Sequence, residues 1–256
     1  MIALMKAEWQ KLWFLRSTRL YFLTLIFTSL SLGLVFSLTT PTTQGKALSE
    51  LTGLQVITAN LLGIDAGAIL LIIFSARTVA YEFSTKLIHV SLAVTPQRVR
   101  FFTAKILTFG LLSLGIGVLI TALTFGCGQI ILFANGRTLL SLSSPGVLQL
   151  LAGCALLPIF YCLLTVCLTF LFRSSAGGIS CSLGLMLLPA LASWFEIFVQ
   201  RIVLPLLPRA ALHSLSGLAE PGTPEALPVW LGLLSLFLWL SIPYLLAAWD
   251  FKKRDV

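Results

Sequence analysis

An aspartate inside a long apolar run is the residue in this sequence that most strongly suggests chemistry. Asp65 lies near the middle of the run from 54 to 74. An ionisable side chain at the centre of a membrane span costs roughly 2.5 to 3.5 kcal/mol on insertion scales. Two interpretations stay open: Asp65 lines a polar path or binds a proton, or it is a hydrogen-bonded carboxyl that locks two helices together. No obvious basic partner occurs in the middle of another apolar run.

Small residues accompany this acid in the same run. Ala59, Gly63 and Gly67 are spaced four apart, a pattern that allows two membrane helices to approach closely. Asp65 is two residues from Gly63, about 200° around a helix. The packing face and the acid are therefore predicted to point in nearly opposite directions. Asp65, Gly63 and Gly67 are the candidates for a translocation path or a helix contact.

The other reactive side chains form no catalytic or metal-binding pattern. His89 and His213 lack ligand spacing, and the five cysteines show no paired spacing. The metalloprotease pattern H-E-x-x-H and the hydrolase pattern G-x-S-x-G are absent. The phosphate-binding pattern G-x-x-x-x-G-K-[ST] is absent as well. We therefore expect that the chain is not an enzyme and holds no metal or cofactor of its own.

The composition predicts the elements that position these residues. The chain has 256 residues, of which 58% are hydrophobic and 10% are charged, whereas soluble domains carry roughly 25% charged residues. The mean hydropathy is +1.01, which excludes a soluble globular domain. Six apolar runs are long enough to cross a bilayer as helices. The prediction is an all-α polytopic membrane protein, one transmembrane domain over 1–256, with spans at about 20–38, 54–74, 106–125, 148–172, 179–195 and 229–249.

The net charge of +8 is explained by membrane orientation. Six spans return both termini to the same side. Only Lys46, Arg137, Arg201 and Arg209 fall on the other side, which leaves thirteen of the 17 basic residues on the side of the termini. The positive-inside rule then predicts cytoplasmic termini in the plasma membrane. The bilayer is the expected partner of these charges, and nucleic acid is not.

Three segments outside the spans carry further signals. Residues 1–19 include Ile2, Met5, Trp9 and Leu12 at helical spacing, which favours an amphipathic helix at the membrane interface. The stretch 75–105 is the longest predicted cytoplasmic connection, and Thr95 and Pro96 within it resemble a helix start. The external stretch 196–228 is apolar in its first half but interrupted by prolines. Such a stretch favours a re-entrant or interface-lying pair of short helices.

The order and spacing of these features resemble a known family, the permease subunits of ABC type-2 exporters near the bacitracin-resistance and lantibiotic-immunity group. The resemblance covers nearly the whole chain. It is carried by an amphipathic start, a Glu-Phe pair after the second span, a step toward the third span, and a basic C-terminus. The residues are Glu8 and Lys11, Glu82 and Phe83, Leu92 to Pro96 with Arg98, Ala104 and Lys105, and Phe251 to Asp255.

The resemblance implies a six-span half-transporter that is driven by a separate ATPase subunit in two copies, which would bind ATP and Mg²⁺. A second permease copy or a paralogue would complete the assembly. The cytoplasmic connection 75–105 would dock into the ATPase, with Glu82, Phe83, Leu87, Ile88 and His89 as coupling residues. The implied cargo is amphipathic or hydrophobic, such as an antimicrobial peptide, a drug or a lipid-like compound. Two alternatives remain: an ion-coupled secondary transporter that uses Asp65, and a membrane scaffold that transports nothing.

Overall fold

Six long apolar helices build the protein. The structure is a computed structural model that describes all residues except 15, 45–51, 95–96, 193, 221 and 254–256. The described part is all-helical, and no strand occurs within it. The segments long and apolar enough to cross a membrane are Arg16–Thr40, Gly53–Ser84, Arg98–Ala134, Val147–Phe172, Ser175–Ala192 and Val229–Lys253. The predicted fold class, an all-α polytopic membrane protein with six spans, is confirmed.

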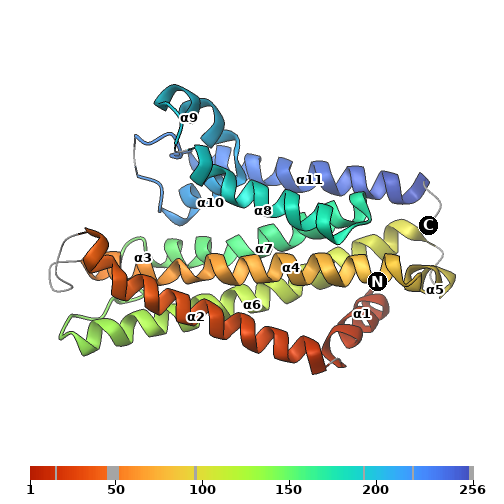
Figure 1. The fold of residues 1–256 in the computed structure, drawn as a ribbon, viewed down its shortest axis with the longest axis horizontal. Coiled ribbons are helices and arrows are strands. Elements are labelled where there is room, and N and C mark those ends of the chain that lie inside the picture. Colours follow the sequence, from red (N-terminus) through yellow and green to blue (C-terminus); the bar gives the residue numbers. More distant parts are fainter. Residues whose placement is uncertain (15, 45–51, 95–96, 193, 221, 254–256) are drawn as a thin grey trace.

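The chain runs through these helices in a simple order (Figure 1). The long helices are α2 (Arg16–Gln44), α4 (Gly63–Ser84), α6 (Arg98–Ala134), α7 (Val147–Phe172), α8 (Ser175–Ala192) and α11 (Val229–Lys253). The short elements are α1 (Ile2–Phe14), α3 (Gly53–Leu61), α5 (Leu87–Val94), α9 (Ile197–Val203), the 3₁₀ turn η1 (Leu204–Leu206) and α10 (Pro208–Ser216). The N-terminus, the C-terminal end of α11 and α5 lie together at one end of the bundle, which we call the termini end. Helices α3, α9 and α10 lie toward the opposite end.

Helix α7 is the centre of the bundle. It packs against α4, α6, α8, α10 and α11. At the termini end its Phe170 ring meets three aromatic rings from α4, α6 and α11, with centroids 4.8 to 5.4 Å away: Phe83, Phe102 and Phe251. Aromatic pairs at these separations stabilise a core beyond their buried area. The four helices are therefore held together at the end where the chain begins and ends.

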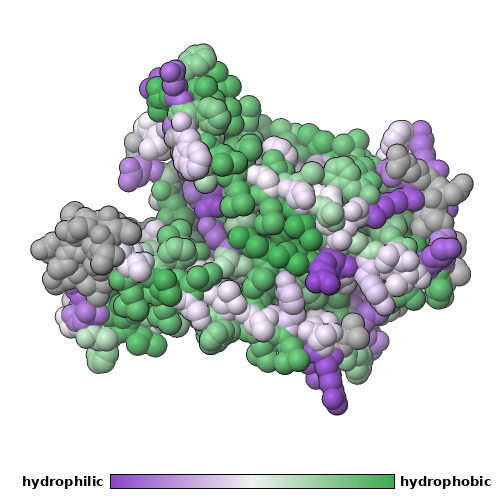
Figure 2. Space-filling view, viewed as in Figure 1, coloured by the Kyte–Doolittle hydropathy of each residue, from purple (hydrophilic) through white to green (hydrophobic). Residues whose placement is uncertain are grey.

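The outer surface of the bundle suits a bilayer. Figure 2 shows hydrophobic side chains along the sides of the long helices, with hydrophilic side chains concentrated at the termini end and on the α9–α10 segment. Helix α11 is the least buried of the six spans. Because lipid is as apolar as the side chains it contacts, exposed leucines there carry no hydration penalty.

The predicted cytoplasmic stretch 75–105 contains the end of α4, the whole of α5 and the start of α6. Ser75 to Ser84 continue α4, and α6 already begins at Arg98. Helix α5 lies between them, after a turn in which Lys86 has a φ of 58°. The hydropathy of the sequence placed the limits of the second and third spans at about 74 and 106. Both helices continue beyond these limits, past charged residues that are paired in the folded protein. The proposed helix start at Thr95 and Pro96 lies outside the described residues.

The N-terminal segment is a helix, as predicted, but it buries a different face. Leu12 and the acidic Glu8 are buried, whereas Trp9 and Trp13 are exposed and lie 6.5 Å apart, ring to ring. Exposed tryptophans are typical of the membrane interface. Glu8 therefore faces the bundle, and the aromatic residues face outward.

Gly63 permits the closest helix contact in the second span. Its carbonyl oxygen accepts a hydrogen bond of 2.7 Å from the Ser29 hydroxyl of α2, and a Cβ at Gly63 would collide with the Ser29 backbone. We expect Gly63→Ala to destabilise the protein by about 1–3 kcal/mol through overpacking. The measurement is the thermal unfolding midpoint in detergent. Gly115→Ala in α6 is the control, since a Cβ there meets nothing within 4 Å, and equal midpoints for the two variants would contradict the prediction.

Candidate functional site

Asp65 lies in the first turn of α4, just after a local break in the second span. The Leu62 N–H bonds to the Ala59 carbonyl oxygen at 3.3 Å, and the Asp65 N–H bonds to the Leu62 carbonyl oxygen at 3.1 Å. Both hydrogen bonds join residues three apart, whereas those of an α-helix join residues four apart. The α-helical pattern is therefore interrupted between α3 and α4. A carboxylate in the first turn of a helix is favoured by the helix dipole. Asp65 is therefore stabilised by the start of α4, a feature that the continuous apolar run did not reveal.

Arg209 is the partner that the sequence did not reveal. Its Nη2 atom lies 2.7 Å from Asp65 Oδ2. Arg209 belongs to α10, within the segment 196–228 that was predicted to be re-entrant or interfacial. Its Nη1 atom also approaches the carbonyl oxygen of Met186 in α8 at 3.5 Å. One guanidinium thus connects α4, α8 and α10.

A histidine and a second carboxylate extend this pair. Arg209 Nε donates to His213 Nε2 at 3.2 Å, and His213 Nδ1 lies 2.9 Å from Glu225 Oε2. Because Nε2 accepts a hydrogen bond from Arg209, a ring proton on Nδ1 is positioned to be donated to Glu225. The hydrogen bond from His213 lowers the pKa of Glu225, although desolvation opposes this shift. The four side chains form a polar chain from α4 to the connection that precedes α11.

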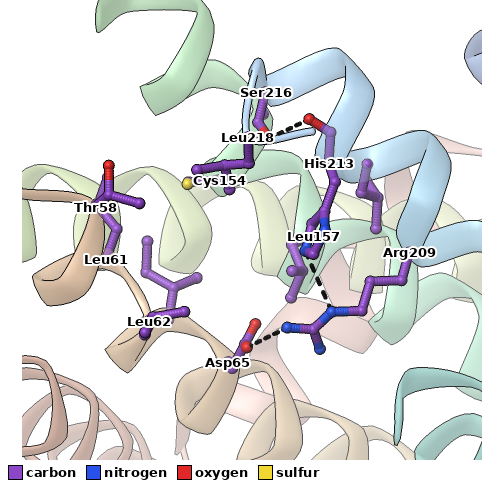
Figure 3. Close-up of a pocket in the computed structure, with 13 residues that line it drawn as sticks. Thr58, Leu61, Leu62, Asp65, Cys154, Leu157, Arg209, His213, Ser216 and Leu218 are labelled. Carbon is purple, nitrogen blue, oxygen red and sulfur yellow. Dashed lines mark hydrogen bonds and ion pairs between the residues drawn. The ribbon is translucent and has the colours of Figure 1, made fainter. Parts of the chain in front are cut away.

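A cavity of about 180 Å³ adjoins this chain and is drawn in Figure 3. Its walls are mainly apolar side chains of α3, α4, α7 and α10, and Asp65, Arg209 and His213 supply its charged and polar groups. We call it the Asp65 cavity. A second cavity of about 530 Å³ shares Thr58, Leu62 and Leu218 with it and is also lined by Gln55 and Glu220. The two spaces are neighbours at the end opposite the termini.

The glycines of the second span lie on another face. Gly63 and Gly67 both approach Ser29 of α2, whereas Asp65 faces α10 and the cavity. Of the three candidates for a path or a contact, the structure therefore places two at a helix contact and one at a cavity.

A second group of charges lies at the termini end. Lys105 of α6 is 1% exposed, and its ammonium group contacts the carboxylates of Glu8, at 3.0 Å, and of Glu82. Lys11 binds the other oxygen of Glu8 at 2.6 Å and lies 3.9 Å from Glu82. We call these four residues the Lys105 cluster. Two acids and two bases balance each other, as burial of charge requires.

The Lys105 cluster joins three helices and contacts a fourth. Glu8 and Lys11 come from α1, Glu82 from α4 and Lys105 from α6. Lys11 Nζ also lies 3.4 Å from the Ser91 hydroxyl of α5. A displacement of α5 would therefore act on charged groups that hold the ends of two membrane spans.

The five predicted coupling residues occupy different environments. Glu82 is buried in α4, and the Phe83 ring packs 5.4 Å from that of Phe170. In α5, Ile88 is buried, whereas Leu87 and His89 are exposed. Only Leu87 and His89 are therefore available for direct contact with a partner. Glu82, Phe83 and Ile88 face the interior of the bundle.

Because of Glu8, we expect the stability of the folded protein to depend on pH in the acidic range. Desolvation raises the pKa of Glu8, but the charges and hydrogen bonds of Lys105 and Lys11 outweigh it and lower the pKa below the ordinary 4.5. The stabilisation from a carboxylate with a lowered pKa is present above pH 4.5 and is lost as the pH falls through the folded-state value. We expect wild type to unfold at a higher temperature than Glu8→Gln at pH 7.

This difference in unfolding temperature should shrink as the pH is lowered below 4.5. The measurement is the unfolding midpoint of both proteins from pH 7 downward. Glu196→Gln removes an exposed carboxylate and serves as the control. A constant difference between wild type and Glu8→Gln over the whole pH range would contradict the prediction.

The structure defines the chain as a multi-span helical membrane protein with two polar sites, one near each end. No protein-family model matches the sequence, and a search of curated proteins finds no match either.

Proposed function

We propose that the chain is the transmembrane subunit of an ATP-driven exporter of the ABC type-2 kind. The observation that carries this proposal is the Lys105 cluster, which links α5 through Lys11 to α1, α4 and α6. A short helix between two spans that is tied to both of them is suited to receive a push from a separate motor. The sequence lacks a phosphate-binding loop, so ATP and Mg²⁺ would bind to that partner.

Helix α5 is the proposed docking element for the ATPase. Its Ile88 is buried against the bundle, whereas Leu87 and Val90 are 45% and 64% exposed. These apolar side chains lie at an end of the bundle, beside the polar Lys86 and His89. A protein partner would cover them, as exposed apolar patches rimmed by polar residues do at interfaces.

The basic residues support a cytoplasmic position for the termini end. Lys6, Lys11, Lys252 and Lys253 belong to the described parts of α1 and α11 at that end. Cytoplasmic segments are enriched in lysine and arginine. In this orientation the Asp65 cavity lies in the outer half of the plasma membrane, and α5 faces a cytosolic ATPase.

The proposed mechanism is alternating access. Two ATPase copies close on ATP and push on α5 of this chain and of a second permease copy or paralogue. Helix α4 is continuous from Gly63 to Ser84, so movement at Glu82 is transmitted along it to Asp65. Breaking the contact between Asp65 and Arg209 would release α10 and open the outer cavities. An amphipathic or hydrophobic cargo would leave by this route.

The test is capture of the partner with the tagged, full-length chain in mild detergent. We expect an ATP-hydrolysing protein with a phosphate-binding loop, identified by mass spectrometry, and at least about tenfold less of it with Leu87→Asp, because a charge would be buried at the contact. Leu142→Asp is the matched control, since Leu142 is similarly exposed but lies in the connection between α6 and α7. Absence of an ATPase, or equal loss with both variants, would overturn the proposal.

The four-residue polar chain favours one alternative, an ion-coupled secondary transporter. Asp65, Arg209, His213 and Glu225 connect a membrane span to a connecting segment through contacts of 2.7 to 3.2 Å. The Asp, Glu and His members of this polar chain are the residue types that bind and carry protons in transporters. Cargo uptake into vesicles that contain only this chain, driven by a proton gradient, would support the alternative. A scaffold would show neither ATPase capture nor gradient-driven transport.

A further inference from the structure

The Asp65 carboxylate offers one unused oxygen to the Asp65 cavity. Oδ2 is bound by Arg209, and Oδ1 accepts no hydrogen bond from a described residue. The side chain is 27% exposed. In Figure 3 one oxygen of Asp65 meets Arg209 and the other points into the space lined by Leu62 and Leu157. A charged acceptor without a donor is therefore available to a ligand.

Each nitrogen of the Arg209 guanidinium contacts an acceptor from the protein. Its Nη2 contacts Asp65, its Nε contacts His213 and its Nη1 approaches the Met186 carbonyl oxygen. These contacts use three of the five N–H donors of the guanidinium, and a cation can bind Asp65 Oδ1 without displacing any of them.

The charges around the two cavities also favour a cation. Asp65 and Glu220 line them, and Glu225 lies behind His213. Arg209 is the one lysine or arginine among the described residues that line the two cavities. The hydrogen bond from His213 lowers the pKa of Glu225, and the acidic residues at and behind the two cavities outnumber the one guanidinium that lines them.

The volume and the lining of the Asp65 cavity limit the size of the group to which the cation is attached. A cavity of about 180 Å³ is close to the engineered apolar cavity of about 150 Å³ that accommodates a benzene-sized molecule. Its walls include Leu61, Leu62, Leu157 and Leu212. A chain of a few methylene groups would fill this space, and any larger body would extend into the neighbouring cavity past Leu218.

We propose that the Asp65 cavity binds a primary ammonium group on a short aliphatic chain, with the ammonium on Asp65 Oδ1 and the methylene groups among the leucines. The inference rests on the proposed function only in assigning this group to the exported cargo. Binding itself requires no ATPase. The two proposals can therefore fail separately.

Cys154 lines the Asp65 cavity and reports on what enters it. The wild-type chain in nanodiscs is treated with methanethiosulfonate reagents that carry an aminoethyl, a sulfonatoethyl or a methyl group. Peptide mass spectrometry then gives the modification rate of Cys154. Cys127 of α6, which does not line this cavity, is the internal reference for differences between the reagents. The rate of each charged reagent is divided by that of the neutral one, so that changes in thiol reactivity cancel.

We expect the aminoethyl reagent to be favoured over the sulfonatoethyl reagent at Cys154 by at least about tenfold relative to Cys127, because of the nearby negative charge. Asp65→Asn should reduce this preference to about threefold or less, since it removes one unit of charge. Glu196→Gln, at an exposed acid outside the cavity, should leave the preference unchanged. Hexylammonium should slow modification of Cys154 by the neutral reagent, and hexanoate should not.

An equal or reversed charge preference would overturn the inference. Equal preference in wild type and Asp65→Asn would do the same, as would a Cys154 that no reagent modifies. If Asp65→Asn does not fold, the comparison of hexylammonium with hexanoate on wild type decides the matter. Failure to capture an ATPase would leave these results intact, because the assay contains only this chain.

Discussion

Replacement of Lys105 with methionine is expected to destabilise the protein more than any other single substitution considered. Lys105 is 1% exposed and contacts the carboxylates of Glu8 and Glu82. Methionine keeps most of the aliphatic volume but leaves two buried acids without this cation. Breaking a buried ion pair from one side costs about 3–5 kcal/mol. The measurement is the free energy of unfolding in a denaturing detergent titration.

Lys11→Met is the matched control, because Lys11 belongs to the same cluster but its side chain is 49% exposed. Exposed ion pairs contribute about 0–1 kcal/mol. The triple variant Glu8→Gln, Glu82→Gln, Lys105→Met should recover much of the loss, because no buried charge is left unpaired in it. Equal destabilisation by Lys105→Met and Lys11→Met would contradict the assignment of Lys105 as the centre of the cluster.

Arg209→Met is expected to have the second largest effect. It removes the guanidinium from Asp65 and leaves a carboxylate at the wall of an apolar cavity. An unsatisfied, partly buried polar group costs about 1–3 kcal/mol. The contacts of Arg209 with α4 and α8 are lost together. The same unfolding titration measures this effect, and ATP-driven transport by the complete assembly should fall with it.

Arg201→Met provides the comparison, since Arg201 lies in α9 of the same segment and is exposed. Its removal should change the unfolding free energy by less than about 0.5 kcal/mol. Adding Asp65→Asn to Arg209→Met should restore part of the stability, because the orphaned charge is gone. A double variant no more stable than Arg209→Met would show that the two side chains act independently.

Hydropathy was sufficient to predict the six spans. It did not predict how far the helices continue past charged residues that are paired. Each span contains an apolar run long enough for a bilayer. Helix α6 begins before Lys105, and α4 extends beyond Glu82, so both helices continue into the stretch 75–105. The two charges lie inside helices because each finds its partner there. The partner of each charge lies too far along the chain to be predicted from the neighbouring residues.

The candidate site was predicted only in part for the same reason. Asp65 was recognisable because an acid in an apolar run is rare. Arg209 is 144 residues away in a proline-interrupted segment, and only the packing of α10 brings it to Asp65. Glu8, Lys11, Glu82 and Lys105 each contributed to the family resemblance, yet no spacing rule indicated that they meet. Gly63 could be predicted as a packing residue because the four-residue spacing is local.

The most direct test of the proposed function is a site-specific crosslink from α5. A photoreactive residue replaces Leu87, which is exposed, and a second variant carries it at Lys252 near the end of α11. The chain is irradiated in membranes together with its ATPase candidate. We expect a crosslink from position 87 to the ATPase, which would also place α5 in the cytoplasm. A crosslink from position 252 alone, or from neither position, would contradict the assignment of α5 as the coupling helix.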